Sequence, residues 1–153
     1  MPFSRPAVRR QQNKITEVSR RNIVDALLLD REPFHGRLDL ISFLKRIWPL
    51  QNMASTDHRF ENAEGDIWQH MVRNEDWTYD TLLYTKLDVL SVADETFAAF
   101  LETCVHPLAC PDSVRSTRLI GLFNKALSKD GFVMRPAGQM SGRNTYKVVS
   151  TSG

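Results

Sequence analysis

The residues best suited to chemistry in this sequence are an aspartate and a histidine in the middle of the chain. Asp66 and His70 are four residues apart, which places both side chains on one side of a helix. An aspartate so placed can orient an imidazole ring or share a metal ion with it. Asp57, His58 and Asp76 are near in the sequence and could join the pair. A metal-dependent hydrolase is therefore one hypothesis, and a histidine hydrogen-bonded at the edge of the core is the other.

The surrounding sequence lacks the motifs that would identify a reaction. It contains no His-Glu-x-x-His or Cys-x-x-Cys metal signature and no Gly-x-Ser-x-Gly nucleophile elbow. Cys104 falls on the apolar face of a predicted helix, where packing explains it better than catalysis. We therefore expect a non-enzymatic protein without catalytic residues, bound metal or cofactor. The candidate polar site consists of Asp66, His70, Arg59, Arg73, Asp76 and Trp77.

A helix over about residues 57–73 is predicted to hold these side chains, with Ser55 or Thr56 at its start. Asp66 lies on its polar face, and His70 lies at the boundary between the polar and apolar faces. We expect this helix to be the central one of the fold, with its apolar stripe buried. The stripe consists of Phe60, Ala63, Ile67 and Met71, with Trp68 and Val72 at its margin.

The rest of the chain predicts further helices and then a β-hairpin. Two segments near the C-terminus alternate in the manner of strands, and Pro136, Gly138 and Gly142 predict a connection longer than a two-residue turn. The fold class expected is α+β and mainly helical, with five or six helices packed around a central helix and a C-terminal β-hairpin. Residues suited to begin or end the other helices are Thr16, Asp39, Asp76, Asp94, Asp112 and, at the last C-terminus, Gly131.

Length and composition are those of one ordinary domain. The chain has 153 residues, of which 42% are hydrophobic and 25% charged, enough for a sizeable core. Residues 1–13 are basic and polar and predict a flexible arm, followed by a single domain over 14–150. No apolar run is long enough to span a membrane and no hydrophobic signal core is present, so we expect a cytoplasmic protein without membrane contacts.

Charge is unevenly distributed along the chain. Residues 1–50 carry +5, residues 51–104 carry −8 and residues 105–153 carry +5, within a net charge of +2. The segments could pack against one another, or the two ends could form one basic surface. A helix followed by a basic hairpin is compatible with a winged helix that binds nucleic acid. The candidate contacts are Arg115, Arg118, Lys125, Lys129, Arg135, Arg143 and Lys147.

Four sequence blocks resemble a known family. GRLDLISFLKRIWPL, STDHRFENAEGDIWQHMVRNEDW, FLETCVHPLACPD and FNKALSKDGFVM…QMSGRNTY occur in this order. Together, over about Ile15 to Val148, they resemble the third class of N-terminal domain in the AbiJ abortive-infection proteins of bacteria. In that family the domain is typically joined to a toxic effector such as a HEPN ribonuclease and is considered an accessory or sensing module of antiphage defence.

The resemblance implies a sensor or adaptor module whose partner is an effector protein or domain, and it assigns no catalytic residues. A chain of this length leaves no room for an effector as well, so we expect either a domain that stands alone or an excised part. Three functions follow in order of preference. They are a recognition module, a nucleic-acid-binding module and a metal-dependent hydrolase at Asp66 and His70.

Overall fold

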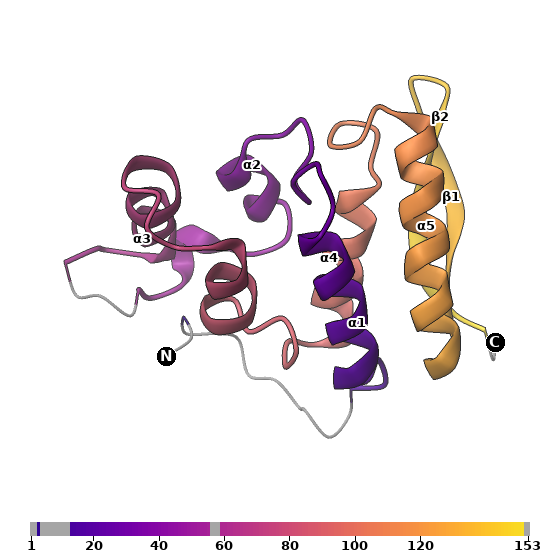
Figure 1. Cartoon of the computed structure of the whole chain (residues 1–153), viewed down its shortest axis with the longest axis horizontal. Helices are drawn as coiled ribbons and strands as arrows, with labels where there is room; N and C mark the ends of the chain where they lie inside the picture. Colours follow the sequence, from indigo (N-terminus) through magenta and orange to yellow (C-terminus); the bar gives the residue numbers. More distant parts are fainter. Residues whose placement is uncertain (1–2, 4–12, 56–58, 152–153) are drawn as a thin grey trace.

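The computed structural model describes residue 3 and residues 13–55 and 59–151. Helices precede a C-terminal antiparallel hairpin (Figure 1), which confirms the mainly helical α+β class. The elements are α1 (Glu17–Leu28), α2 (Leu40–Lys45), a 3₁₀ turn (Leu50–Asn52), α3 (Ala63–Ile67), a π-helical turn (Trp68–Arg73), a second π-helix (Thr81–Lys86), α4 (Asp94–Cys104), α5 (Ser113–Leu127), a 3₁₀ turn (Ser128–Asp130), β1 (Phe132–Met140) and β2 (Arg143–Ser150).

Several helix ends lie where the sequence predicts them. The side chains of Thr16, Asp39 and Asp112 accept hydrogen bonds from backbone N–H groups in the first turns of α1, α2 and α5, at 3.3, 2.9 and 2.9 Å. Each bond satisfies a donor that the helix itself cannot pair. Gly131 follows α5 and its 3₁₀ extension with a φ of 81°, the left-handed conformation that glycine adopts without strain.

Asp94 and Asp76 are not the N-caps that the sequence predicts, because their carboxylates accept hydrogen bonds from other parts of the chain. Asp94 begins α4 without capping it, and its carboxylate instead accepts from the backbone N–H groups of Lys14 and Ile15 at 2.7 and 3.1 Å. Thr78, and not Asp76, caps the next helical turn: its hydroxyl accepts from the backbone N–H of Thr81 at 3.1 Å. Asp76 is thereby left to contact another side chain, described below.

The element at the centre of the core is α4. Its inward residues are fully buried, and the ring of Phe100 lies 5.6, 6.0 and 6.1 Å from those of Phe34, Phe43 and Trp48. In Figure 1 α4 lies in the middle of the molecule and α3 at one end. The helix predicted over 57–73 is therefore not the central one, because it lies at one end of the molecule. Hydrophobic stripes identify a buried face but do not say which helix is covered on most sides.

The helix over 57–73 also differs in its extent and exposure. It begins at Ala63, where Asn62 rather than Ser55 or Thr56 is the N-cap, and Thr56 lies outside the described residues. Phe60 precedes the helix and is only half-buried. Trp68 and Val72, expected at the buried margin, are 46% and 47% exposed. Because α3 lies at an end of the molecule (Figure 1), other elements cover only one side of it.

The hairpin has a tighter turn than the sequence predicts. Ser141 and Gly142 alone connect β1 to β2, with φ angles of 53° and 77°. Positive φ at both residues is typical of the type I′ turn, whose twist matches that of paired strands. The register shifts between Pro136 and Gly138, so these residues are accommodated by a bulge within β1. The expectation of a longer connection is therefore wrong.

Side chains from two helices fix the outer edges of the hairpin. Asn124 of α5 accepts from the backbone N–H of Met134 at 2.7 Å. Glu102 of α4 accepts from the backbone N–H of Val148 at 2.9 Å. Unpaired edge groups of a sheet readily attract another strand, and these bonds instead hold the hairpin against α4 and α5.

The predicted arm over residues 1–13 lies largely outside the described residues. Phe3 is described, and it is buried, with its backbone N–H donating to the carbonyl of Lys86 at 2.9 Å. Its ring centroid lies 6.4 Å from that of Trp77. The start of the chain therefore contacts the same end of the molecule as the candidate polar site.

Candidate functional site

A sharp reversal of the chain after α3 builds the site around His70. The π-helical turn over Trp68–Arg73 widens the helix, and Glu75 then adopts a φ of 54°. Both conformations are uncommon and cluster at functional sites. The reversal brings the backbone N–H groups of Asp76 and Trp77 to the carbonyl of His70, at 2.9 and 3.3 Å. Residues six and seven positions further along the chain thus fold back onto the histidine.

The ring of His70 is held on its face and at its edge. It stacks on Trp77 with ring centroids 4.4 Å apart and planes 11° from parallel. Phe60 lies 6.0 Å away at 78°, an edge-to-face contact. Aromatic contacts of these kinds stabilise a fixed ring orientation. The histidine is therefore an oriented group and not a freely rotating surface residue.

Both ring nitrogens of His70 lie near carboxylates. Nδ1 is 2.8 Å from Oδ1 of Asp76, and Nε2 is 3.4 Å from Oδ1 of Asp66. A carboxylate can only accept hydrogen bonds, so Nδ1 carries the hydrogen in the shorter contact. The predicted four-residue spacing of Asp66 and His70 thus does bring them together. Asp76, expected nearby, completes a row of carboxylate, imidazole and carboxylate.

Asp66 is the buried member of this row. Its side chain is 1% exposed, and Oδ2 accepts from the hydroxyl of Ser55 at 2.5 Å. Oδ1 is within ion-pair distance of His70 but receives no hydrogen bond with acceptable geometry from the described residues. Burying an incompletely hydrogen-bonded carboxylate costs free energy. Such exceptions call for an explanation, such as stored strain or a functional role.

The structure assembles four of the six predicted site residues. Asp66, His70, Asp76 and Trp77 form the His70 cluster described above. Arg59 lies instead over the ring of Phe60, with its guanidinium carbon 5.5 Å from the centroid. Arg73 is exposed, and among the described residues no hydrogen bond, ion pair or ring contact joins it to the cluster. Asp57 and His58 lie outside the described residues.

Sequence reasoning missed three contributors to this site. Ser55 was considered only as a helix cap, and Phe60 only as a core residue. Lys86, from the second π-helix, places its ammonium nitrogen 4.7 Å from the centroid of Trp77, a favourable cation–π distance. No local pattern connects Lys86 with Trp77, because the contact depends on how two turns pack.

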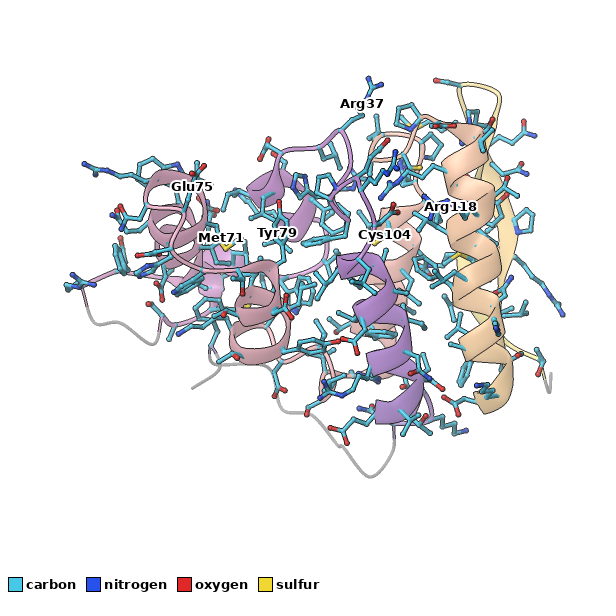
Figure 2. The ribbon with its side chains drawn as sticks, viewed as in Figure 1. Arg37, Met71, Glu75, Tyr79, Cys104 and Arg118 are labelled. Carbon is cyan, nitrogen blue, oxygen red and sulfur yellow. The ribbon has the colours of Figure 1, made fainter. Side chains whose placement is uncertain are left out.

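The surface beside the His70 cluster exposes two apolar side chains. Trp68 and Val72 lie one turn apart on the π-helical segment, each nearly half exposed. Figure 2 shows Met71 of this segment, and Glu75 just after it, at the end of the molecule opposite Arg118 of α5. The apolar pair and the His70 cluster therefore occupy an end that is distant from the basic helix.

The first two predicted nucleic-acid contacts are engaged within the protein. Arg115 is buried, and its Nη2 lies 3.5 Å from Oδ2 of Asp30 and 3.4 and 3.3 Å from the carbonyls of Glu32 and Pro33. Arg118 donates to Asp30 at 3.1 Å. Burial opposes ionisation of Asp30, but the hydrogen bond and charge of Arg118, with the charge of Arg115, hold its pKa below the usual value. These arginines tie α5 to the end of α1.

Two further cations of that set contact the protein itself. Arg143 donates to the carbonyls of Cys110, at 3.0 Å, and Pro111. Lys147 pairs with Glu102 at 3.3 Å. The structure therefore does not gather the seven cations into one free surface. Lys125, Lys129 and Arg135 are exposed and form no ion pair with another described residue.

Other sequence hypotheses concern cysteine, metal and membrane. Cys104 is fully buried, and burial raises the pKa of its thiol, as expected of a packing residue. Among residue 3, 13–55 and 59–151, no group of three or more His, Cys, Asp or Glu side chains is placed to hold a metal ion. None of the helices in these same ranges is long and apolar enough to cross a membrane.

The fold and site together define a mainly helical α+β domain with an ordered polar cluster and exposed apolar side chains at one end. Residues 14–148 match the family described as AbiJ N-terminal domain 3. The chain belongs to this family, and the family associates it with abortive-infection defence against phage. Comparison with curated proteins and with solved structures gives no match.

Proposed function

We propose that this domain is a non-enzymatic sensor or adaptor module of a bacterial antiphage system, acting in the cytoplasm on an effector protein or domain. One observation carries the proposal. Trp68 and Val72 are exposed on the same turn that holds the His70 cluster. The effector would bind this end of the molecule.

The physical features of this end favour recognition. Exposed tryptophan is strongly enriched among the residues that dominate protein–protein binding energies. A partner binds more tightly to a surface whose side chains are already ordered, because less conformational entropy is lost. The stacking of His70 on Trp77 and its contacts with Asp66 and Asp76 provide that order.

The contacts of His70 also favour a positioning role over proton transfer. A general base needs a nitrogen within reach of a substrate proton. Here Nδ1 is occupied by Asp76, and Nε2 faces the buried carboxylate of Asp66. The imidazole is thus directed toward groups of its own chain, and it shapes the surface beside Trp68.

Competition in cells tests the proposal. Bacteria carrying a complete defence system that contains this domain would also produce the isolated domain in excess. We expect the excess domain to occupy the effector and to lower phage protection, whereas a Trp68→Ser variant should not compete. Val18→Ser is the matched control, because Val18 is 71% exposed on α1, and it should compete like the unsubstituted domain.

Two results would contradict this function. Equal competition by the Trp68→Ser variant would show that this end does not bind the effector. Growth arrest upon infection, caused by the isolated domain alone, would indicate an intrinsic toxic activity instead of recognition.

Nucleic-acid binding is a second candidate function, supported by exposed lysines at the end of α5 and in the 3₁₀ turn that follows it. Lys125 and Lys129 lie one turn apart and have no ion pair with another described residue. Lysines near a helix C-terminus also interact favourably with the macrodipole, so binding must be measured. Filter binding at low salt should show retention of DNA or RNA that declines steeply with salt. A triple Lys125→Ser, Lys129→Ser and Arg135→Ser variant should lose this retention, and no retention at low salt would reject the candidate.

A further inference from the structure

A groove between α4 and the hairpin has features of a binding site that differ from those of the His70 cluster. Its volume is about 690 Å³, within the range of small-molecule sites. One wall comes from α4 and the residues after it, the other from the bulged part of the hairpin, and the C-terminus of α2 contributes at one end. The lining residues are Arg46, Ala99, Glu102, Thr103, His106, Ala137, Thr145, Tyr146 and Lys147.

His106 presents a hydrogen-bond donor in this groove. Its Nδ1 accepts from the backbone N–H of Leu108 at 3.1 Å, so Nδ1 is unprotonated and Nε2 carries the ring hydrogen. Burial, and next the charge of Arg46, lower the pKa of His106. The ring is therefore neutral near neutral pH and retains one N–H group, at Nε2.

The groove also has an excess of positive charge. Glu102 is the only carboxylate among the described residues that line it. Its charge is balanced by Lys147 at 3.3 Å, and it also accepts from the backbone N–H of Val148 at 2.9 Å. Arg46 has no ion pair with another described residue, and its charge is close enough to affect His106. A site of this kind attracts an anion, because the guanidinium has donors without acceptors.

We propose that this groove binds a small phosphate monoester. Arg46, His106 and Tyr146 all line the groove and offer a guanidinium, the Nε2–H group and a hydroxyl as donors. A phosphate monoester has three terminal oxygens to accept from them, whereas a carboxylate has only two. Lys147 supplies a further cation once the ligand draws it from Glu102. The inference goes beyond the proposed function and does not depend on the surface near Trp68.

The groove has room for an organic group attached to the phosphate. Its volume of about 690 Å³ is within the range of sites that hold small organic molecules. The side chains of Ala99 and Ala137 and the half-buried ring of Tyr146 offer apolar surface. A flat ring on the ligand can stack on tyrosine. Adenosine monophosphate combines both features and is a suitable probe.

Calorimetry on the whole chain tests the proposal with four probes. They are adenosine monophosphate, inorganic phosphate, adenosine, and a single-stranded oligonucleotide without terminal phosphate. We expect adenosine monophosphate to bind, inorganic phosphate to bind more weakly, and adenosine and the oligonucleotide to give no saturable binding. Amide resonances of residues 102–106 and 145–147 should shift with adenosine monophosphate.

Matched charge variants identify the site. Arg46→Gln should weaken the binding of adenosine monophosphate by about tenfold or more, the usual effect of losing a charge-assisted hydrogen bond. Lys125→Gln, which removes an equal charge from α5 outside the groove, should leave affinity within about twofold by the same arithmetic. Arg46 and Lys125 are both exposed, so both variants should fold, and the melting temperature checks this.

Four results would overturn the proposal. They are no binding of adenosine monophosphate at millimolar concentration, equally tight binding of adenosine, binding of the oligonucleotide alone, and equal effects of Arg46→Gln and Lys125→Gln. The third would instead indicate a polymer surface, and the fourth a nonspecific charge effect.

Discussion

Two polar clusters in this domain contain buried charges but differ in how completely those charges are bonded. In the first, Arg20 of α1 is 0% exposed, and each of its three nitrogens donates a hydrogen bond. The acceptors are the carbonyls of Ile15, Val89 and Val92, at 2.9, 2.9 and 2.7 Å, and Asp94, at 2.9 Å. The Arg20 cluster therefore joins α1, the loop before α4 and α4 itself.

The His70 cluster is less complete. Asp66 is as buried as Arg20, yet its Oδ1 has no hydrogen-bond donor among the described residues. Asp76 is half exposed, and the backbone beside it adopts unusual conformations. A fully bonded buried charge is expected to stabilise a unique fold, whereas incomplete bonding next to exposed apolar side chains is typical of a site. Substitutions in the Arg20 cluster should therefore lower the free energy of unfolding much more than substitutions in the His70 cluster.

The largest effect is expected for Arg20→Met. The substitution would leave Asp94 without its buried partner and remove donors from three carbonyls, so the free energy of unfolding should fall by about 3–5 kcal/mol. Urea unfolding measures this change. Arg31→Met is the control, because Arg31 is exposed, and it should change stability by less than about 0.5 kcal/mol. An equally small change in the free energy of unfolding for Arg20→Met would show that the Arg20 cluster does not stabilise the fold.

A pair of phenylalanine substitutions compares the centre of the core with the His70 end. Phe100→Ala should cost about 3–5 kcal/mol through lost burial and a cavity among the rings of Phe34, Phe43 and Trp48. Phe60→Ala should cost clearly less, since Phe60 is only half-buried. Thermal unfolding of both variants decides the matter. Equal losses would mean that the segment before α3 is as central as α4.

A smaller effect is expected for Asp76→Asn. Asp76 is half exposed, and its contact with His70 is of the kind worth about 1 kcal/mol or less. The loss should be measurable by urea unfolding but far below that of Arg20→Met. Glu61→Gln is the control for removal of an exposed carboxylate nearby. If Asp76→Asn lowered the free energy of unfolding as much as Arg20→Met does, the His70 cluster would be a structural element and not a site.

The features that were predicted correctly are those that depend on residues close together in the sequence. The caps at Thr16 and Asp112, the left-handed Gly131 and the C-terminal hairpin all follow from local patterns. The four-residue spacing likewise brought Asp66 and His70 together. Arg20, by contrast, looks like an ordinary surface residue of α1, because the carbonyls that bind it lie about seventy positions away.

The remaining errors have two physical sources. The π-helical turn and the positive φ of Glu75 fold the chain back onto His70, and no propensity of single residues predicts such a reversal. The basic surface failed to assemble because Arg115 satisfies backbone carbonyls that folding brings near it. The groove beside His106 was missed because its residues come from three elements far apart in the sequence.

The unfolding free energy of Asp66→Asn tests the contrast between the two clusters most directly. The substitution removes an incompletely bonded buried charge while keeping nearly the same shape, and an amide can still accept from Ser55 and donate to Nε2 of His70. Stability should be unchanged within about 0.5 kcal/mol or should rise, as is common when a functional residue is replaced. A loss of about 3 kcal/mol or more, the usual result of breaking a structural buried pair, would contradict the account.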